Sequence, residues 1–291
     1  MMTDEIRTFL DKEGRLKHWP SRRHHKDAVL RWLGLCFAPG RFYTEREVNA
    51  ILEQAHSFGD FFLLRREMVE AGVLQRTRNG SKYWRGRLWP HWQPFETERL
   101  SIKAAGSDDF PALWTVYDAC RHDALWEGLD EPCSEDSLRD ELEGRRLPPN
   151  GSSEFARMTL LTHRESGQPA GLAATYTGYP RESACWLGLF LLHPDFRRQG
   201  LGREFVAAYH AECALQGYDR VGLGVSLRNQ SGMKFWVEMG YRQISSMTMD
   251  GEKEPGRPGM LGLWQTLENP WPVKPPMPAE EEATAALDGS R

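Results

Sequence analysis

An apolar run that ends in a glycine loop constrains the fold of this 291-residue chain more than any other feature. Residues 184–192 form a strand-like segment, and Cys185–Leu192 is a near-continuous run of apolar side chains. Such a run is typical of a strand that is buried on both faces of a sheet. It continues through His193-Pro194 to Gly200-x-Gly202, where a helix is predicted to begin. The apolar face of that helix comprises Leu201, Phe205, Ala208 and Leu215.

This strand, loop and helix predict an anion site. Gly200 and Gly202 allow backbone amides to approach an anion without obstruction by side chains. The first turn of the helix adds a partial positive charge, which suits a pyrophosphate. No Gly-Lys-Ser/Thr sequence follows, which excludes a P-loop, and the missing third glycine excludes the dinucleotide-binding fingerprint.

The remainder of the C-terminal region alternates between strands and helices. Further strands are predicted at 97–103, 156–163, 169–177, 220–225, 241–248 and 259–267. Helices are predicted at 109–120, at 134–144 with Ser134 as its cap, and after Asn229. The pattern predicts a mixed α/β (α+β) fold, with a central mixed sheet and flanking helices.

Taken together, these motifs resemble the GNAT acyltransferase family. The resemblance extends over residues 96–268 and depends on the spacing of four motifs: Arg197-x-x-Gly200-x-Gly202, Asn229, Phe235-Trp236 and Gly240-Tyr241. It implies an acetyl-CoA-dependent N-acyltransferase in which a primary amine attacks the thioester directly. No covalent enzyme intermediate is needed, and an amide of the split strand polarises the thioester carbonyl.

The resemblance also implies the residues that bind acetyl-CoA. The strand would offer backbone groups to the pantetheine arm at Phe190 and Leu192, and the arm would be flanked by Asn229, Phe235 and Trp236. The pyrophosphate would be held, mainly through amides, by Arg197, Arg198, Gln199, Gly200, Leu201, Gly202 and Arg203. No metal is predicted, because His18, His24, His25 and His56 lack a metal-ligand spacing with carboxylates or cysteines.

The catalytic acid and base are less clear, because the chain departs from the family at two positions. Trp236 stands where many relatives carry the tyrosine that protonates the thiolate, and an indole has no proton to give. Water, the thiol itself or another tyrosine must therefore handle that proton. Trp186 stands where some relatives carry a carboxylate, so Glu182 is the candidate base, with a solvated loop glutamate as the alternative reading.

The acceptor is expected to bind between the first two helices of the GNAT-like region. Asp123, Trp126 and Glu127 lie there and would suit a cationic amine, although a helix surface explains them equally well. His193 is interpreted as a structural residue at the end of the strand.

The N-terminal region predicts a different and smaller fold. A short helix at 27–35 precedes a capping box at Thr44–Glu47, a second helix capped by Asp60, and a hairpin around Asn79-Gly80. Helix, turn, helix and hairpin is the order of a winged helix. Residues 8–86 resemble a small bacterial winged-helix-like domain of unknown function, which is α+β.

The charge distribution raises the question of a nucleic-acid partner. Residues 1–90 hold 17 Lys+Arg against 11 Asp+Glu, whereas the remainder holds 20 against 30. Duplex DNA is one predicted partner, through the cations Arg65, Arg66, Arg76, Arg78, Lys82 and Arg85. Alternatively, Arg65 and Arg66 pair with Asp60, Glu67 or Glu70, and the module binds a protein or forms a dimer.

These observations predict four segments: a winged-helix-like domain (1–87), a connector (88–95), the transferase domain (96–268) and a flexible acidic tail (269–291). We expect a cytoplasmic protein, because the N-terminus lacks a signal-peptide layout and no apolar run is long enough to span a membrane. The five scattered cysteines indicate neither disulfides nor zinc. Two alternatives to an enzyme remain, namely a regulator that senses acetyl-CoA without turnover and a protein-interaction adaptor.

Overall fold

The computed structural model describes residues 5–38, 41–86, 95–121, 134–181, 183–249, 258–271 and 275. The chain divides into two compact units. The N-terminal unit comprises Met1–Gly86, Leu215–Gly217 and Asn269–Arg291, and the C-terminal unit comprises Arg87–Ala214 and Tyr218–Glu268.

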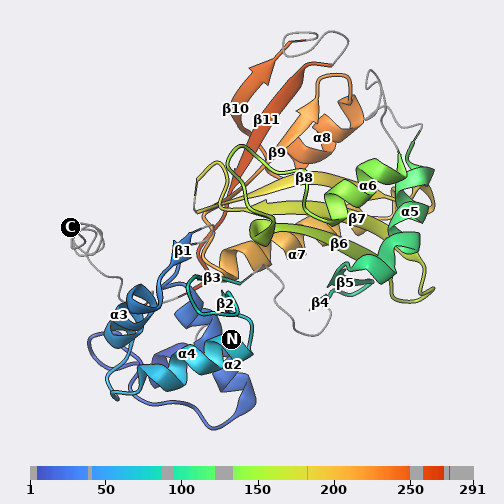
Figure 1. The fold of residues 1–291 in the computed structure, drawn as a ribbon. Coiled ribbons are helices and arrows are strands. Elements are labelled where there is room, and N and C mark those ends of the chain that lie inside the picture. The colour runs from blue at the N-terminus through green and yellow to red at the C-terminus, as the bar shows by residue number, and fades with distance from the viewer. Residues whose placement is uncertain are drawn as a thin grey trace. The chain divides into compact units, whose positions relative to one another are not determined.

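The N-terminal unit is a small α+β domain, as expected. Its three short strands form a sheet in the order β1-β3-β2 (Figure 1). Its elements are η1 (Ile6–Phe9), α2 (Arg23–Gly34), β1 (Phe42–Tyr43), α3 (Glu45–Ala55), α4 (Phe61–Glu70), β2 (Leu74–Arg76) and β3 (Tyr83–Arg85). Helix α2 therefore begins four residues before the predicted start.

Both predicted helix caps of this unit are confirmed. The Glu47 amide donates to the Thr44 hydroxyl at 3.3 Å, and the Thr44 amide donates to the Glu47 carboxylate at 2.6 Å, which completes the capping box of α3. Asp60 accepts from the Leu63 amide at 2.9 Å and caps α4. These contacts satisfy amides that the first turn of a helix leaves without partners.

The predicted hairpin is present, but its turn is wider than the two-residue turn predicted at Asn79-Gly80. Gly80 alone takes a positive φ, +70°, and its amide donates to the Thr77 carbonyl at 2.9 Å. The Thr77 amide donates to the Lys82 carbonyl at 3.0 Å, which leaves four residues in the loop. The Asn79 side chain explains the difference, because its oxygen accepts from the Ser81 amide and hydroxyl and from the Thr77 hydroxyl.

The C-terminal unit contains an eight-stranded mixed sheet, as expected, in the order β10-β11-β9-β8-β7-β6-β5-β4 (Figure 1). Its pairs are antiparallel except β8 with β9. Its strands are β4 (Phe95–Glu96), β5 (Leu100–Ala104), β6 (Ala156–His163), β7 (Pro169–Thr177), β8 (Ala184–Leu192), β9 (Arg220–Ser226), β10 (Gln243–Thr248) and β11 (Met260–Thr266). Its helices are η2 (Ser107–Asp109), α5 (Phe110–Ala119), α6 (Glu135–Leu142), η4 (Ser153–Phe155), η5 (Pro194–Phe196), α7 (Leu201–Leu215) and α8 (Gln230–Glu238).

Helices cover both faces of this sheet, so the unit has two cores. Alternation along β7 separates them: Leu172 and Ala174 pack with α5 and α6, whereas Ala173 packs with α7 and α8. Strands β6, β7 and β8 have the predicted bounds. The Ser134 cap of α6 is also confirmed, since its hydroxyl accepts from the Ser137 amide at 3.0 Å.

The predicted apolar face of α7 was wrong at two of its four positions. Ala208 and Leu215 of α7 are only half-buried, and the helix buries Val206, Tyr209 and Cys213 beside Leu201 and Phe205. The covered stripe is therefore broader than the predicted face, because the helix packs against several strands of the sheet.

The tail prediction also needs correction at its start. Trp271 is buried rather than flexible, and its amide donates to the Asn269 side chain at 3.1 Å. Burial of a large indole surface is favourable enough to hold this residue in place. Connector residues 88–94 lie outside the described residues. Within the described ranges, none of the helices combines the length and hydropathy that a bilayer crossing requires.

Candidate active site

The sheet of the C-terminal unit splits between its two parallel strands. Strand β8 pairs with β9 from Ala184 to Leu187, whereas from Leu189 onward it pairs only with β7. The β7–β8 register shifts between these two parts, and Gly188 is the extra residue. Such a bulge bends a strand and leaves its backbone groups unpaired.

The split corrects the expectation that β8 is buried on both faces. Its first four residues are buried or half-buried, but Gly188 is exposed, and Leu189, Phe190 and Leu192 are half-buried. The apolar sequence of β8 is uniform along its length, so it could not indicate where β9 stops covering it. A molecule that enters the split would meet the edge of β8 and these apolar side chains.

The predicted glycine loop lies at the end of β8 and has an unusual backbone. Arg198 adopts φ +62° and Gly200 φ +85°, in the left-handed region that favours glycine. The first helical i→i−4 hydrogen bond at the start of α7 runs from the Glu204 amide to the Gly200 carbonyl, at 3.1 Å. The amides of Leu201, Gly202 and Arg203 therefore have no acceptor within the helix and are available to an anion.

Gly202 brings three predicted regions together. A Cβ at this position would lie 3.3 Å from Leu192 Cδ1 and 3.4 Å from Phe235 Cζ. The loop, the end of β8 and α8 thus converge, as the sequence predicted for an acetyl-CoA site. A larger side chain at Gly202 would displace one of these neighbours.

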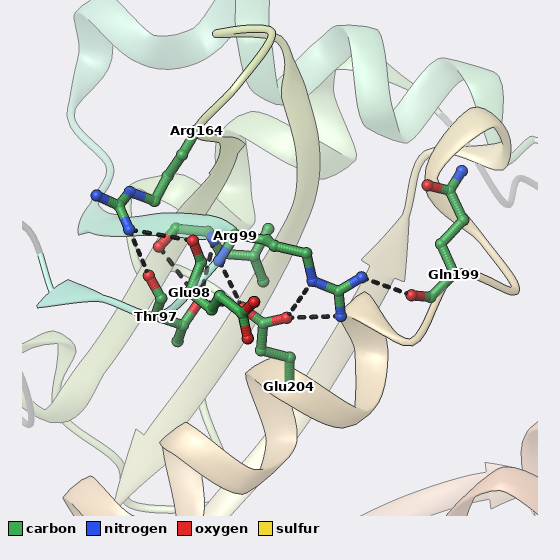
Figure 2. A network of polar contacts seen from close by, with 7 residues as sticks. Thr97, Glu98, Arg99, Arg164, Gln199 and Glu204 are labelled. Carbon is green, nitrogen blue, oxygen red and sulfur yellow. Dashed lines mark hydrogen bonds and ion pairs between the residues drawn. The ribbon is translucent and has the colours of Figure 1, made fainter.

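A network of polar contacts ties the loop to the segment that leads into β5 (Figure 2). Glu204, in the first turn of α7, accepts from the Thr97 hydroxyl at 2.5 Å and from the Arg99 amide at 2.8 Å. The Arg99 guanidinium donates to the other carboxylate oxygen of Glu204 at 2.7 Å and to the Gln199 carbonyl at 2.7 Å. Arg164 donates to the carbonyls of Thr97 and Glu98 at 2.8 and 3.1 Å.

We call Thr97, Arg99 and Glu204 the loop clamp. Partial burial raises the pKa of Glu204, but the hydrogen bonds from Thr97 and Arg99 and the charge of Arg99 outweigh it and leave that pKa lowered. Glu204 is therefore ionised at neutral pH. The sequence did not predict the clamp, because about a hundred residues separate its two halves and no local spacing links them.

The Arg197 side chain makes contacts within the protein. Its Nε donates to the Leu192 carbonyl at 2.8 Å, and its Nη2 lies 3.0 Å from Cys120 Sγ. The side chain thus holds the end of β8 against α5. The same bond occupies the Leu192 carbonyl, a backbone group that was predicted to face the pantetheine arm.

Helix α8 supplies the other wall of the split. Asn229 accepts from the Gly232 amide at 2.8 Å and so caps the helix. Phe235 and Trp236 are half-buried. The centroid of the Trp236 ring lies 6.0 Å from that of Phe190 and 5.3 Å from that of Tyr241. Trp236 therefore packs on the predicted path of the pantetheine arm.

Two nearby tyrosines cannot replace the missing catalytic tyrosine. Tyr209 and Tyr241 are fully buried, and burial raises the pKa of each well above its ordinary value. The Tyr241 hydroxyl is hydrogen-bonded to His210 Nε2 at 2.8 Å. Both rings are part of the core on the α7 and α8 side of the sheet.

A cavity of about 470 Å³ lies on the other side of Gly188. Residues of α5, α6, β6, β7 and β8 contribute to its wall, among them Tyr117, Glu141, Tyr176, Tyr179, Trp186 and Gly188. Glu141 is the one carboxylate among the described residues of the lining. Burial raises the pKa of Glu141, and the charge of Arg146 partly offsets that effect.

The sequence did not point to Glu141, Tyr176 or Tyr179, because only the packing of α6 and β7 beside β8 brings them to one cavity. The predicted base Glu182 and the predicted acceptor residues Asp123, Trp126 and Glu127 lie outside the described residues. His193 caps η5, since its Nδ1 accepts from the Asp195 amide at 3.3 Å, which agrees with a structural role.

The arginines of α4 in the N-terminal unit are engaged in ion pairs. Arg65 donates to Glu45 at 2.7 Å and to Asn49 at 2.5 Å, and its side chain is only 17% exposed. Arg66 lies 3.8 Å from Glu70, as the alternative interpretation predicted.

Three of the four hairpin cations are exposed: Arg76, Arg78 and Lys82. Arg85 is buried and donates to the Phe37 carbonyl at 3.4 Å, so the prediction that it faces a partner was wrong. All three residues of β3 are buried, so Arg85 has no exposed face of the strand to occupy.

Three potential metal ligands that the sequence did not link also lie close together in this unit. The ligand atoms of Glu5, His24 and His25 lie within 4.8 Å of one another. The fold brings η1 beside the first turn of α2, a proximity that the spacing along the chain did not indicate.

Comparison with known proteins agrees with this description. Residues 120–241 match the sequence profile of the acetyltransferase (GNAT) family, and residues 15–85 match that of DUF2087, described as an uncharacterized protein conserved in bacteria. No curated protein matches the chain.

Solved acetyltransferase structures resemble the chain at low identity. An acetyltransferase from Thermus thermophilus is 21% identical, covers 60% of this chain and 100% of its own, and has a TM-score of 0.46. A ribosomal-protein-alanine N-acetyltransferase from Brucella melitensis is 20% identical, with coverages of 57% and 99% and a TM-score of 0.43. An N-acetyltransferase from Staphylococcus aureus is 14% identical, with coverages of 59% and 100% and a TM-score of 0.45.

Proposed function

The chain contains an acetyltransferase domain of the GNAT family at residues 120–241, and on that premise we propose that it transfers an acetyl group from acetyl-CoA to a primary amine. One observation carries the proposal. Gly188 is both the residue at which β8 leaves β9 and part of the cavity wall. A thioester in the split would therefore meet an amine in the cavity.

In this proposal the loop amides and the split bind different parts of acetyl-CoA. The amides of Leu201, Gly202 and Arg203 bind the pyrophosphate, and the pantetheine arm follows β8 toward Gly188. The backbone at the bulge then donates to the thioester carbonyl, whose oxygen gains negative charge as the amine attacks. Orientation of the two substrates supplies much of the rate.

The reaction forms one bond and breaks another. The amine nitrogen bonds to the thioester carbon, the carbon–sulfur bond breaks, and CoA leaves with the electron pair as a thiolate. The nitrogen loses a proton, and the thiolate takes one up. Water or the exposed thiol handles the second transfer, since Trp236 has no ionisable proton.

Glu141 is a candidate for the group that accepts the amine proton. Its raised pKa brings this carboxylate closer to the range in which a general base works at neutral pH. Glu182 remains the alternative that the sequence indicated.

An acetylation screen tests the proposal. The full chain is incubated with acetyl-CoA and a panel of amines, amino acids, aminoglycosides and peptides, and products are identified by mass spectrometry. We expect a product that carries one added acetyl group on nitrogen. Binding of acetyl-CoA without any acetylated product would favour a sensor in which the GNAT domain does not turn over.

We further propose that the N-terminal unit binds duplex DNA through its hairpin. The exposed cations Arg76, Arg78 and Lys82 support this proposal, because each phosphate contact adds salt-dependent affinity. Arg65, which the sequence counted among the DNA-binding cations, is paired with Glu45 and contributes less to this proposal. A protein partner remains the alternative, and a cytoplasmic location stays a prediction.

A further inference from the structure

Two imidazoles and a carboxylate converge in the N-terminal unit, at the first turn of α2. His24 and His25 belong to that turn, and Glu5 directly precedes η1. The ligand atoms of the three side chains all lie within 4.8 Å of one another, and His25 Nε2 is 3.7 Å from Glu5 Oε2. Histidine nitrogen and carboxylate oxygen are both common ligands of metal ions in proteins.

The two histidine rings lie closer together than their places in the helix require. Successive residues of an α-helix point about 100° apart, and such neighbours do not face each other. The ring centroids of His24 and His25 are nevertheless 3.9 Å apart, with planes at 55°. Both rings therefore lie on one side of the helix start, the side on which Glu5 lies.

Packing holds the segments that carry these donors. Ile6 and Phe9 of η1 are buried, and the Thr8 hydroxyl donates to the Glu5 carbonyl at 2.8 Å. The Phe9 ring lies against His25, with centroids 5.0 Å apart. Helix α2 is fixed by the buried residues of its inner face. An ion at the three donors would therefore order only side-chain torsions, which keeps the entropic cost of binding small.

The spacing fits a small transition-metal ion after modest rotation of the side chains. Zinc binds histidine nitrogen and carboxylate oxygen at about 2.0–2.2 Å, so two ligands of a tetrahedral ion lie roughly 3.4 Å apart. The 3.7 Å gap between His25 and Glu5 is already close to that value. The side chains of Glu5 and His25 are 48% and 24% exposed, and His24 is exposed, so the donors have room to close the wider gaps.

The donor set favours zinc over magnesium or calcium. Magnesium and calcium prefer oxygen ligands, whereas imidazole suits zinc, copper and nickel. Two of the three donors are imidazoles, and Glu5 supplies the negative charge. Lys26, the next residue of the helix, is directed elsewhere: its Nζ lies 3.9 Å from Glu67 Oε2 and 5.4 Å from the centre of the Trp19 ring.

We propose that Glu5, His24 and His25 form a binding site for one zinc ion. The ion joins η1 to the first turn of α2, and the three protein ligands leave its fourth position to water. The site is independent of the proposed acetyl transfer and of the proposed DNA binding. It departs from the sequence expectation of no metal, which considered only spacing along the chain.

Isothermal titration of zinc chloride into the full chain, freed of metal with a chelator, tests the proposal. We expect one zinc ion per chain, and magnesium or calcium should bind at least about a hundredfold more weakly. No zinc binding at about 100 μM, or magnesium bound as tightly as zinc, overturns the proposal.

Variants show whether these three residues hold the ion. Glu5→Gln and His24→Ala each remove one ligand and should weaken zinc binding at least about tenfold. Both side chains are exposed, so neither change opens a cavity in the core. The control His163→Ala removes a histidine of the C-terminal unit, hydrogen-bonded to Ser166 at 3.0 Å, and should bind zinc like wild type. Wild-type affinity in both ligand variants overturns the proposal.

Hydrogen exchange with mass spectrometry shows whether the ion joins the two segments. Saturating zinc should slow amide exchange in peptides that cover η1 and α2, because an ion bound only to the folded state suppresses local opening. Exchange in the C-terminal unit should not change, and His24→Ala should show no slowing. Slowed exchange elsewhere but not in η1 and α2 would place the ion at another site and overturn the proposal.

Discussion

Replacing Glu204 by glutamine should weaken acetyl-CoA binding without unfolding the C-terminal unit. One carboxylate oxygen accepts from the Thr97 hydroxyl and the Arg99 amide, and glutamine keeps this oxygen. The other accepts from the Arg99 guanidinium, at 2.7 Å from both Nε and Nη2. In Glu204→Gln an amide nitrogen replaces this second oxygen. The amide N–H groups and the Arg99 guanidinium are both hydrogen-bond donors, so the two side chains no longer pair. Figure 2 shows the native contacts that would be lost.

The structure sets the size of the effect. Hydrogen bonds to charged groups contribute about 1.5–3 kcal/mol each, and we discount them because the Arg99 side chain is 41% exposed, which gives a loss of about 1–3 kcal/mol in unfolding free energy. When Arg99 moves away, the Gln199 carbonyl also loses its hydrogen bond from the guanidinium. This bond helps to fix the loop in which Arg198 and Gly200 have left-handed backbone conformations. We expect the Kd for acetyl-CoA to rise about tenfold, or about 1.4 kcal/mol.

Isothermal titration and urea unfolding measure the two effects separately. The matched control is Asp219→Asn, which breaks another arginine–carboxylate pair, with Arg181 Nη2 at 2.6 and 2.7 Å, at the start of β9. The control should lose stability and keep its acetyl-CoA affinity. The reasoning is refuted if Glu204→Gln binds acetyl-CoA like wild type, or if both variants lose affinity equally.

The clamp also predicts a pH dependence. The pKa of Glu204 is lowered from 4.5 in the folded chain, so its contribution to stability is complete above about pH 4.5 and is lost as the pH falls toward the folded pKa. Acid unfolding of Glu204→Gln should therefore be less steep than that of wild type.

Other substitutions test the remaining parts of the account. Gly202→Asp places a side chain and a negative charge between Leu192 and Phe235, so a folded variant should bind acetyl-CoA at least about tenfold more weakly by titration, and unchanged affinity would exclude the loop as the site. Trp236→Phe should keep kcat within about tenfold of wild type, whereas a loss of several thousandfold would assign Trp236 a chemical role. Burial lowers the pKa of His210 to about 4 from 6.5, so unfolding takes up a proton between these values, and stability should fall as the pH drops from 6.5 to 4; a chemical-denaturation series on His210→Gln should show less of this fall. The double variant Arg76→Ala and Arg78→Ala should flatten the salt dependence of duplex-DNA binding by up to about two units in fluorescence anisotropy, and failure of the wild-type chain to bind at about 50 mM salt would rule out the DNA proposal.

Local rules accounted for most of the secondary structure. The Thr44–Glu47 capping box, the Asp60 cap and the bounds of β7 follow from side chains and spacing within a few residues. The width of the hairpin turn did not follow, because the Asn79 side chain stabilised a four-residue loop instead of the two-residue turn that Asn-Gly favours.

The site was predictable where it is local and not where it depends on packing. Gly200 and Gly202 indicated the loop before α7, because positive φ at the first and close packing at the second favour glycine. The partnership of Arg99 with Glu204 and the position of Glu141 arise only when strands distant in sequence become neighbours. No pattern along the chain encodes those distances.

Two-substrate kinetics test most directly whether acetyl-CoA in the split meets an amine in the cavity. Initial rates are measured with acetyl-CoA and the best acceptor of the screen varied together. We predict that both substrates bind before either product leaves, so reciprocal plots converge, and no acetyl group remains on the protein by intact-mass spectrometry. Parallel lines with an acetylated protein intermediate would contradict direct transfer, and acetyl-CoA binding without product from any acceptor would contradict the enzymatic function itself.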